Sequence, residues 1–216
     1  MSQAVTAPAA QRRAELLDKV VDQVLERGIS QLTLRSLATA VGSNNRMLLY
    51  YFGSREELIV AALHGAERRF PGMERILVDL DDRTRPLADR VLGAWAVIAD
   101  PTNLPFHRLF FEIFGLAGFE RDRFRTLLGL IGNEWVGHLA AGYRDEGTGD
   151  ARAESLAHET VALWRGFQAT LLSLDSTDAV GREAVARASR DALEALLARA
   201  GRLGSEASVS DRHPSC

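Results

Sequence analysis

Three polar residues, Asn44, Asn45 and Arg46, stand between a glycine turn and an apolar helical run. An asparagine amide can hydrogen-bond to adenine N6 and N7, and an arginine guanidinium can hydrogen-bond to guanine O6 and N7. In a helix-turn-helix, the side chains that reach base edges stand at the start of the second helix. The types and placement of these residues therefore favour DNA reading. The alternative is that the asparagines only form a turn and cap a helix.

The segments that would position this polar run have helical periodicity. Apolar residues recur at helical spacing over residues 9–27, and Gly28 stands where a helix ends. Thr33 is placed to cap a second, short helix, and residues 44–51 fit two turns of a third. Residues 54–57, Ser-Arg-Glu-Glu, match a capping box that starts a fourth helix. Two short helices joined by a glycine turn are the elements that a helix-turn-helix requires.

Beyond residue 70 the chain reads as longer helices separated by turn residues. The segments of helical period are 84–99, 104–117, 123–145, 151–174 and 178–200. Strand signals of comparable strength are missing, so we expect an all-α protein with about nine helices. We expect an N-terminal domain over 9–55, a second helical domain over 56–201, and disordered tails at 1–8 and 202–216.

Composition and charge narrow the function classes. The chain has 216 residues and a net charge of -3, but residues 1–55 carry seven basic and four acidic side chains, a net +3 against -6 elsewhere. The positive end therefore coincides with the candidate DNA-reading segment. The one cysteine, Cys216, excludes an intrachain disulfide framework. Neither a transmembrane run nor a signal core is seen in the sequence, so we expect a cytoplasmic protein with no membrane partner.

The sequence gives little indication of a catalytic or metal-binding site. The serines stand in predicted caps, turns and tails without a convergent base, and no glycine loop follows a strand to cradle a phosphate. Glu154 and His158 lack the second Glu-x-x-His element that a metal-binding helical bundle needs. We therefore expect no enzyme activity, no metal and no cofactor.

An ordered set of motifs extends over residues 12–63. It comprises Glu26-Arg27-Gly28, Leu32-Thr33-Leu34-Arg35, Leu37-Ala38, Val41-Gly42, Leu48, Tyr50-Tyr51-Phe52 and Gly53-Ser54-Arg55-Glu56-Glu57-Leu58. This set resembles the DNA-binding domain of the TetR (TetR/AcrR) family of bacterial transcriptional regulators. Together with the polar run, the resemblance implies these DNA-binding residues: Thr33, Arg35, Asn44, Asn45, Arg46, Met47, Leu49, Tyr50, Tyr51 and Arg55.

Several of these positions depart from the family pattern or have another explanation. Where the family commonly has lysine, glycine and threonine, this chain has Asn45, Arg46 and Met47. Leu49 replaces a frequent tyrosine and cannot donate a hydrogen bond to phosphate, although it can contact a thymine methyl group. Core packing is the alternative for Tyr50 and Tyr51, and a solvated charge is the alternative for Arg55.

The resemblance implies that the second domain binds a ligand and forms a homodimer. An aromatic concentration makes the middle segment the candidate ligand pocket, with Glu112 and His138 as candidate polar anchors. The predicted pocket residues are Trp95, Phe106, His107, Phe110, Phe111, Phe114, Trp135 and His138. The alternative is an ordinary aromatic core.

Apolar stripes near the C-terminus predict the dimer interface, because alanines beside them would let helices of two subunits approach closely. The predicted interface residues are Leu163, Trp164, Phe167, Leu171, Leu193 and Leu196. The alternative is a core within one subunit.

These observations predict a sequence-specific DNA-binding transcriptional regulator. In the expected form it is a ligand-responsive repressor that binds a pseudo-palindromic operator in double-stranded DNA as a homodimer, with an unidentified small-molecule effector. The alternative is a protein of the TetR fold that binds ligands or scaffolds partners without specific DNA readout.

Overall fold

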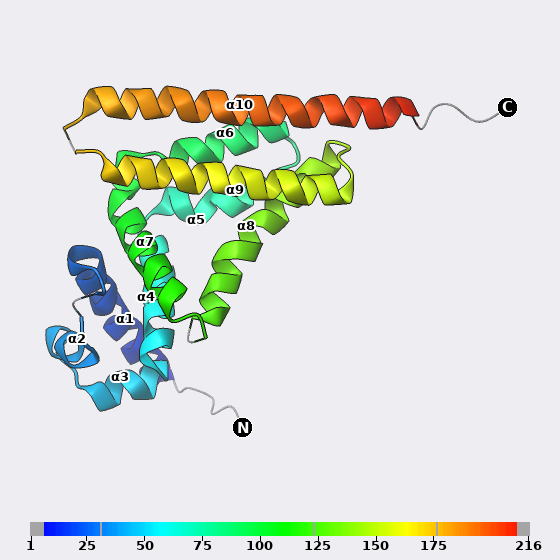
Figure 1. Ribbon diagram of the computed structural model, residues 1–216. Coiled ribbons are helices and arrows are strands. Elements are labelled where there is room, and N and C mark those ends of the chain that lie inside the picture. The colour runs from blue at the N-terminus through cyan, green and yellow to red at the C-terminus, as the bar shows by residue number, and fades with distance from the viewer. Residues whose placement is uncertain (1–6, 31, 123, 176, 211–216) are drawn as a thin grey trace. The chain divides into compact units, whose positions relative to one another are not determined.

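The computed structural model describes residues 7–30, 32–122, 124–175 and 177–210 (Figure 1). Within these residues the protein is all-helical and has no strand, which confirms the expected fold class. The helices are α1 (Ala7–Arg27), α2 (Leu34–Ala40), α3 (Asn45–Phe52), α4 (Arg55–Glu67), α5 (Pro71–Leu80), α6 (Leu87–Ile98), the 3-10 turn η1 (Pro101–Asn103), α7 (Leu104–Phe119), α8 (Arg125–Asp145), α9 (Asp150–Ser173) and α10 (Ala179–Ser210).

Ten α-helices are therefore described, where the sequence predicted about nine. The additional one is α5, which begins at Pro71 and lies before residue 84, where the first predicted segment of helical period beyond residue 70 begins. Proline is well tolerated there, since the first helical N–H has no intrahelical acceptor and the fixed φ of proline suits the helix.

The helices pack as two compact units, which differ from the expected division at residue 55. The N-terminal unit takes in the described residues up to 71 together with 104–128, and the C-terminal unit takes in 72–103 and the described residues from 129 onward. Helix α4 packs on α1 and α3, and α7 packs on α1 and α4, so both belong with the first three helices.

The ends of the chain also differ from the expectation. Helix α1 already begins at Ala7, and α10 continues as a helix to Ser210, where a disordered tail was expected from 202 onward. Residues 1–6 and 211–216 lie outside the described part of the chain.

The core of the N-terminal unit joins the short helices to the long ones. Leu48 of α3 is fully buried, and Leu37 of α2, Val20 of α1 and Leu58 of α4 are buried with it. Burying each such side chain stabilises the fold by about 1.5–3 kcal/mol. Gly65 lets α4 approach α1 closely, because a Cβ there would lie 2.7 Å from Val21 Cγ2. This packing fixes α2 and α3 on a rigid base.

In the C-terminal unit, α6, α9 and α10 pack on one another, and α9 and α10 run antiparallel side by side (Figure 1). Trp95 of α6 joins all three, because its Nε1 donates to Ser189 Oγ at 2.8 Å and its ring lies 5.9 Å from that of Phe167. Arg90 is buried and donates to the carbonyl oxygen of Leu80 at 2.6 Å. Burial lowers the pKa of Arg90 from its ordinary value. None of the helices described is both long and apolar enough to span a bilayer.

Candidate DNA-binding interface

Helix α2 begins at a reciprocal cap. Thr33 Oγ1 accepts a hydrogen bond from Ser36 N at 3.0 Å, and Ser36 Oγ accepts one from Thr33 N, also at 3.0 Å. Two backbone donors that a helix start leaves unsatisfied are paired in this way. Thr33 therefore caps α2 as the sequence predicted, and its side chain remains exposed beside Arg35.

Helix α3 begins at a second cap. Asn44 is the N-cap residue, and its Oδ1 accepts a hydrogen bond from Met47 N at 3.0 Å. The alternative role considered for Asn44, helix capping, is thus present in the structure. Capping occupies one amide oxygen, so the side-chain NH₂ group takes no part in it. Asn45 and Arg46, the first two residues of α3, are exposed.

The remaining residues of α3 divide between two faces. Leu48 and Phe52 are buried against the rest of the unit. On the outer face, Leu49 is 41% exposed and Tyr50 is 69% exposed. Tyr51 is half-buried, and its ring meets that of Tyr50 edge to face at 5.1 Å. The outer face therefore presents apolar and aromatic surface directly behind the polar start of the helix, with Met47 half-buried between the two faces.

Arg13 of α1, which the sequence did not single out, holds the end of α3. Its Nε donates to the carbonyl oxygen of Tyr51 at 3.1 Å, and its guanidinium carbon lies 4.8 Å from the centroid of the Phe52 ring. The last carbonyls of a helix lack intrahelical donors, so an arginine placed here satisfies one of them. The 38-residue separation from Tyr51 leaves no local sequence signal for this contact.

Three arginines lie on the elements of this interface: Arg35 on α2, Arg46 on α3 and Arg55 at the start of α4. Arg35 and Arg46 are exposed and Arg55 is half-buried. Among the residues that the structure describes, none of the three guanidinium groups makes an ion pair, in contrast to Arg12, which pairs with Glu15 at 3.0 Å. Unpaired guanidinium groups suit phosphate oxygens, which they bind through charge-assisted hydrogen bonds.

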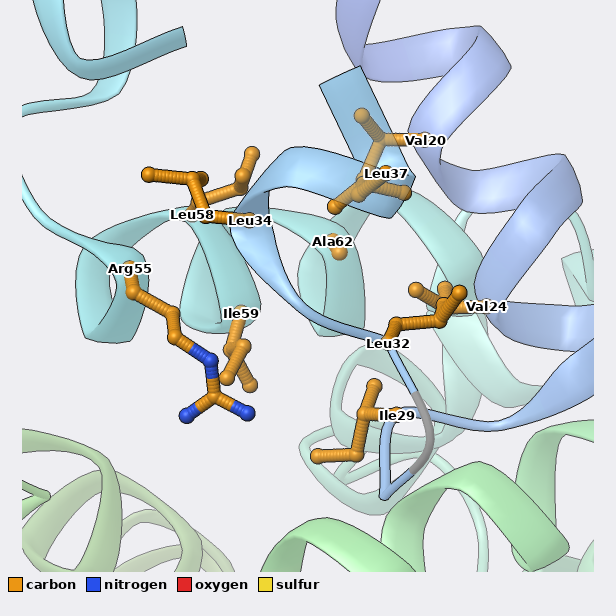
Figure 2. Close-up of a pocket in the computed structure, with 10 residues that line it drawn as sticks. All are labelled: Val20, Val24, Ile29, Leu32, Leu34, Leu37, Arg55, Leu58, Ile59 and Ala62. Atoms are coloured by element: carbon orange, nitrogen blue, oxygen red, sulfur yellow. The ribbon is translucent and has the colours of Figure 1, made fainter. Parts of the chain in front are cut away.

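A small apolar gap lies behind the interface (Figure 2). Its lining residues are Val20, Val24, Ile29, Leu32, Leu34, Leu37, Arg55, Leu58, Ile59 and Ala62. Its volume is about 20 Å³, room for about one water molecule, and its walls are apolar. We interpret it as a packing gap and not as a ligand site. Figure 2 shows the guanidinium of Arg55 beside Ile59, at the edge of this cluster.

The predicted pocket residues are divided between the two units. Phe106, His107, Phe110, Phe111 and Phe114 lie on α7 in the N-terminal unit, whereas Trp95, Trp135 and His138 lie in the C-terminal unit. On α7 the Phe110 ring stacks on that of Phe114 at 6.0 Å. In the C-terminal unit, Trp135 meets the buried Trp164 edge to face at 5.8 Å.

Both candidate polar anchors have partners. Glu112 accepts hydrogen bonds from the backbone of Ile29 and Ser30. His138 Nδ1 lies 2.9 Å from a carboxylate oxygen of Asp81 at the end of α5. Each side chain thus holds a second segment of its own unit.

Trp95 borders a cavity of about 290 Å³ in the C-terminal unit, between α6, η1, α9 and α10. Leu171 and Val185 form apolar walls, and Arg182 and Glu183 also line it. This volume is close to the lower limit of small-molecule sites, about 300 Å³.

The predicted interface residues lie largely inside one subunit. Trp164, Leu171, Leu193 and Leu196 are buried in the single chain, and Leu163 and Phe167 are half-buried. The apolar stripes of α9 and α10 pack against each other within the C-terminal unit, which is the arrangement that the intramolecular alternative describes. The outward positions of the two helices carry small exposed residues: Ala162, Gly166 and Ala169 on α9, and Ala184, Ala188 and Ala195 on α10.

Metal-ligating side chains do not gather in the described part of the chain. No group of three or more His, Cys, Asp and Glu residues is placed there to hold one ion. Glu154 and His158, which the sequence offered as half of a metal element, are both exposed on α9.

The chain is similar to known regulators. The family model described as "Bacterial regulatory proteins, tetR family" matches residues 16–62. The chain is 28% identical over 92 residues to the HTH-type transcriptional repressor NicS of Pseudomonas putida, a match that covers 38% of this chain and 43% of NicS. It is 29% identical over 143 residues to the HTH-type transcriptional repressor KstR2 of Rhodococcus jostii, covering 65% of this chain and 69% of KstR2.

A solved structure shares the fold over most of the chain. A TetR-family transcriptional regulator from Rhodococcus sp. superposes with a TM-score of 0.66 at 19% identity, covering 85% of this chain and 99% of that one. The matched family model spans α2 and α3, with the capped helix start at Asn44 and the exposed face behind it. The family model over residues 16–62 and the two repressors confirm the resemblance to the tetR family of bacterial regulatory proteins, and the solved structure shows that the chain has the same fold.

Proposed function

We propose that this protein is a homodimeric, sequence-specific DNA-binding regulator that represses transcription and releases its operator when a small molecule binds. The observation that carries the proposal is the start of α3, where Asn45 and Arg46 stand exposed on a helix held at both ends. The Asn44 cap fixes its first turn, and Arg13 fixes its last. A helix held in this way is already ordered, so it loses less conformational entropy when it enters the major groove.

Each side chain of the interface has a chemical role in this proposal. Asn45 and Arg46 read base edges, because amide and guanidinium groups match adenine and guanine in the major groove. Leu49 offers an apolar contact to a thymine methyl group, and Tyr50 offers a hydroxyl to a phosphate. The residues that we propose to contact the sugar-phosphate backbone of the DNA are Thr33, Arg35, Tyr51 and Arg55. Asn44 and Met47 would lie at the edge of the major groove.

The charge distribution supports contact with DNA despite the net charge of -3. The segment that carries the interface has a net charge of +3. Phosphate contacts supply non-specific affinity that falls with salt, whereas base contacts supply selectivity. In this proposal Arg35, Arg46 and Arg55 contribute both to the electrostatic attraction of the protein to DNA and to its position along the duplex.

Dimerisation supplies the second half-site. Two recognition helices about 34–36 Å apart would read a pseudo-palindrome one helical turn long. The exposed small residues of α9 and α10, among them Gly166 and Ala188, are the surface that we propose for this contact. Small side chains let helices approach closely, which is how helices of two subunits build a shared bundle.

Repression is part of the proposal because two relatives are named as repressors, and effector control is part of it because the family resemblance implies it. An effector can release DNA only if it binds better to a conformation that fits the operator poorly. In the C-terminal unit we propose the cavity beside Trp95 and the surroundings of Trp135 for it, and in the N-terminal unit, as a separate candidate, the aromatic side chains of α7. A regulator of this kind acts on the chromosome, so the proposal implies a cytoplasmic location.

A protein that keeps this fold without specific readout is the second candidate. The observation in its favour is Leu49, which is 41% exposed on the outer face of α3 and cannot hydrogen-bond to DNA. In that case the arginines would bind phosphates without reading sequence.

A selection of bound genomic fragments, followed by gel-shift titration at two salt concentrations with unrelated competitor DNA, tests the proposal. We expect a competitor-resistant complex on one group of fragments that share an inverted repeat. If every complex is erased by competitor and weakened strongly by salt, the protein does not read sequence and the second candidate holds.

A further inference from the structure

Glu112 of α7 binds the turn that joins α1 to α2. Its Oε2 accepts a hydrogen bond from Ile29 N at 2.8 Å, and its Oε1 accepts one from Ser30 N at 2.6 Å. The two partners are 83 and 82 residues earlier in the sequence. Hydrogen bonds to a charged acceptor are stronger than those between neutral groups. Both carboxylate oxygens thus accept hydrogen bonds from two adjacent backbone N–H groups.

Gly28 makes this contact geometrically feasible. It ends α1 with a φ of +71°, a left-handed conformation that side chains disfavour, and its N–H bonds to the carbonyl oxygen of Val24 at 2.9 Å. A Cβ at this position would lie 2.5 Å from Glu112 Oε2. Glycine therefore fits this position in two ways: its φ suits the turn, and its missing Cβ leaves room for the carboxylate where it lies.

The turn that Glu112 binds determines where α2 begins. Ile29 is buried and lies in the apolar cluster with Leu32 (Figure 2), and Leu32 N donates to the carbonyl oxygen of Ile29 at 3.1 Å. Thr33 follows directly and caps α2, which packs against α3. A shift of the turn would therefore move α2, and α3 with it.

We infer that Glu112 is a positioning residue for DNA recognition, although it lies far outside the helix-turn-helix in sequence and contacts no base. By holding the α1–α2 turn, its carboxylate fixes the angle at which α3 is presented to the major groove. The inference rests on the proposed function. It removes Glu112 from the candidate effector anchors, because both of its oxygens are already used within the N-terminal unit.

Base reading and phosphate binding depend differently on this positioning. A base contact requires a side chain to meet fixed atoms at hydrogen-bond distance, whereas long arginine side chains can follow phosphates through small shifts. Loss of the two hydrogen bonds to Glu112 should therefore reduce selectivity for the operator more than the overall affinity for DNA. A residue that only stabilised the fold would lower the melting temperature and leave the selectivity of the folded protein unchanged.

The test compares Glu112→Gln with Glu26→Gln in the full-length protein. The Glu112 variant replaces one acceptor with an NH₂ group that faces an N–H donor, whereas Glu26 is exposed at the end of α1 and provides the same charge change two residues before Gly28. We measure dissociation constants for the selected operator and for random DNA of equal length, together with the melting temperature. We expect the operator-to-random affinity ratio to fall roughly tenfold for Glu112→Gln, comparable to one lost base contact, and to stay unchanged for Glu26→Gln.

Gly28→Ala and hydrogen exchange provide independent readouts. Gly28→Ala should lower the same ratio, and the double variant should lower it by less than the product of the two single effects, because both substitutions break one contact. The amides of Ile29 and Ser30 should exchange slowly in the wild type and faster in Glu112→Gln. Slow exchange that persists in Glu112→Gln overturns the inference even if that variant binds DNA poorly.

The outcomes separate this inference from the proposed function. A wild-type protein with no preferred DNA overturns both. A wild-type protein that selects an operator, with a Glu112→Gln variant that keeps the same affinity ratio, overturns the positioning role alone. If Glu112→Gln does not fold, Glu112→Asp decides the question through the same ratio, because it keeps the charge and shortens the reach to Ile29 N and Ser30 N.

Discussion

The guanidinium group of Arg13 lies over the ring of Phe52, with its central carbon 4.8 Å from the ring centroid. The same group donates to the carbonyl oxygen of Tyr51 at 3.1 Å, so one side chain of α1 contacts the last two residues of α3. A positive charge at a helix C-terminus also interacts favourably with the helix dipole. The proposed recognition helix is thereby anchored from a helix that carries no base-reading residue.

Arg13→Ala should destabilise the N-terminal unit by about 1 kcal/mol, the sum of an exposed cation–π contact and a hydrogen bond that both face solvent. Urea denaturation measures this change, and operator binding should weaken with it. Arg12→Ala is the matched control, because Arg12 is also exposed and pairs with Glu15 one turn away. Equal effects of the two substitutions would show that Arg13 does not anchor α3.

Arg46→Ala and Asn45→Ala should each cost about 1–3 kcal/mol of operator affinity and relax preference at one base position. The structure leaves both side chains exposed at the start of α3, so the fold should be unaffected. Binding to operators with each base pair substituted in turn measures the change. An unchanged base preference in both variants would remove these residues from the reading surface.

Arg35→Ala and Arg55→Ala should behave differently if these residues bind phosphates. We expect weaker binding to all sequences alike, and a salt dependence whose slope falls by about one for each lost contact. Titrations at four salt concentrations with operator and random DNA measure both quantities. A loss confined to the operator would instead assign Arg35 or Arg55 a base contact.

The caps explain why the N-terminal elements could be predicted from sequence. Thr33 and residues 54–57 were expected to cap helices, and both capping boxes are present in the structure. Capping depends on residues three apart in the chain, so the signal is local. Helical periodicity predicted the all-α fold, and an ordered set of motifs indicated the resemblance to the tetR family; both are confirmed.

Contacts between distant segments could not be predicted. Glu112 was expected as a ligand anchor because a carboxylate among aromatic residues suggests one, and nothing in the sequence indicates its backbone partners at Ile29 and Ser30. Periodicity shows which face of a helix is apolar but not what covers it. Trp164 and Leu193 were therefore placed at a subunit interface, whereas the structure buries them within one chain.

Ala188→Glu together with Gly166→Glu should break the proposed dimer. Both positions are exposed on α10 and α9, so the carboxylates can be solvated in a monomer but would be buried and unpaired in a close helix contact. Light scattering at micromolar concentration measures the mass. Ala88→Glu, an exposed position on α6, is the control. A dimer mass in the double variant would place the subunit contact elsewhere.

Ser189→Ala should destabilise the C-terminal unit, because it leaves the buried Nε1 of Trp95 without its acceptor. An unsatisfied buried donor costs about 1–3 kcal/mol, more than the hydrogen bond itself contributes. Urea denaturation followed by tryptophan fluorescence measures the loss. Ser173→Ala, on the exposed side of α9, should change stability by less than about 0.5 kcal/mol. If both variants were equally stable, the Trp95 N–H would have to find another acceptor.

Tyr143 should give the protein a stability loss at alkaline pH. Its ring is fully buried, and burial raises the pKa of Tyr143 above its ordinary value. Thr160 Oγ1 donates to the carbonyl oxygen of Leu156 at 2.8 Å. The Tyr143 hydroxyl is therefore the donor in its 2.9 Å contact with Thr160 Oγ1. A tyrosine in the unfolded chain loses its proton near pH 10. The unfolded state then binds fewer protons than the folded one, and stability falls as the pH rises further.

Tyr143→Phe should be less stable than the wild type at pH 8 by about 1 kcal/mol, because the donor is lost while Thr160 keeps its bond to Leu156. The difference should shrink as the pH rises above about 10, since only the wild type carries the buried phenol that resists ionisation. Urea denaturation at several pH values measures the trend. Tyr50→Phe, an exposed position on α3, is the control and should follow the wild type throughout. A constant difference between the wild type and Tyr143→Phe across this range would show that ionisation of Tyr143 is not coupled to unfolding.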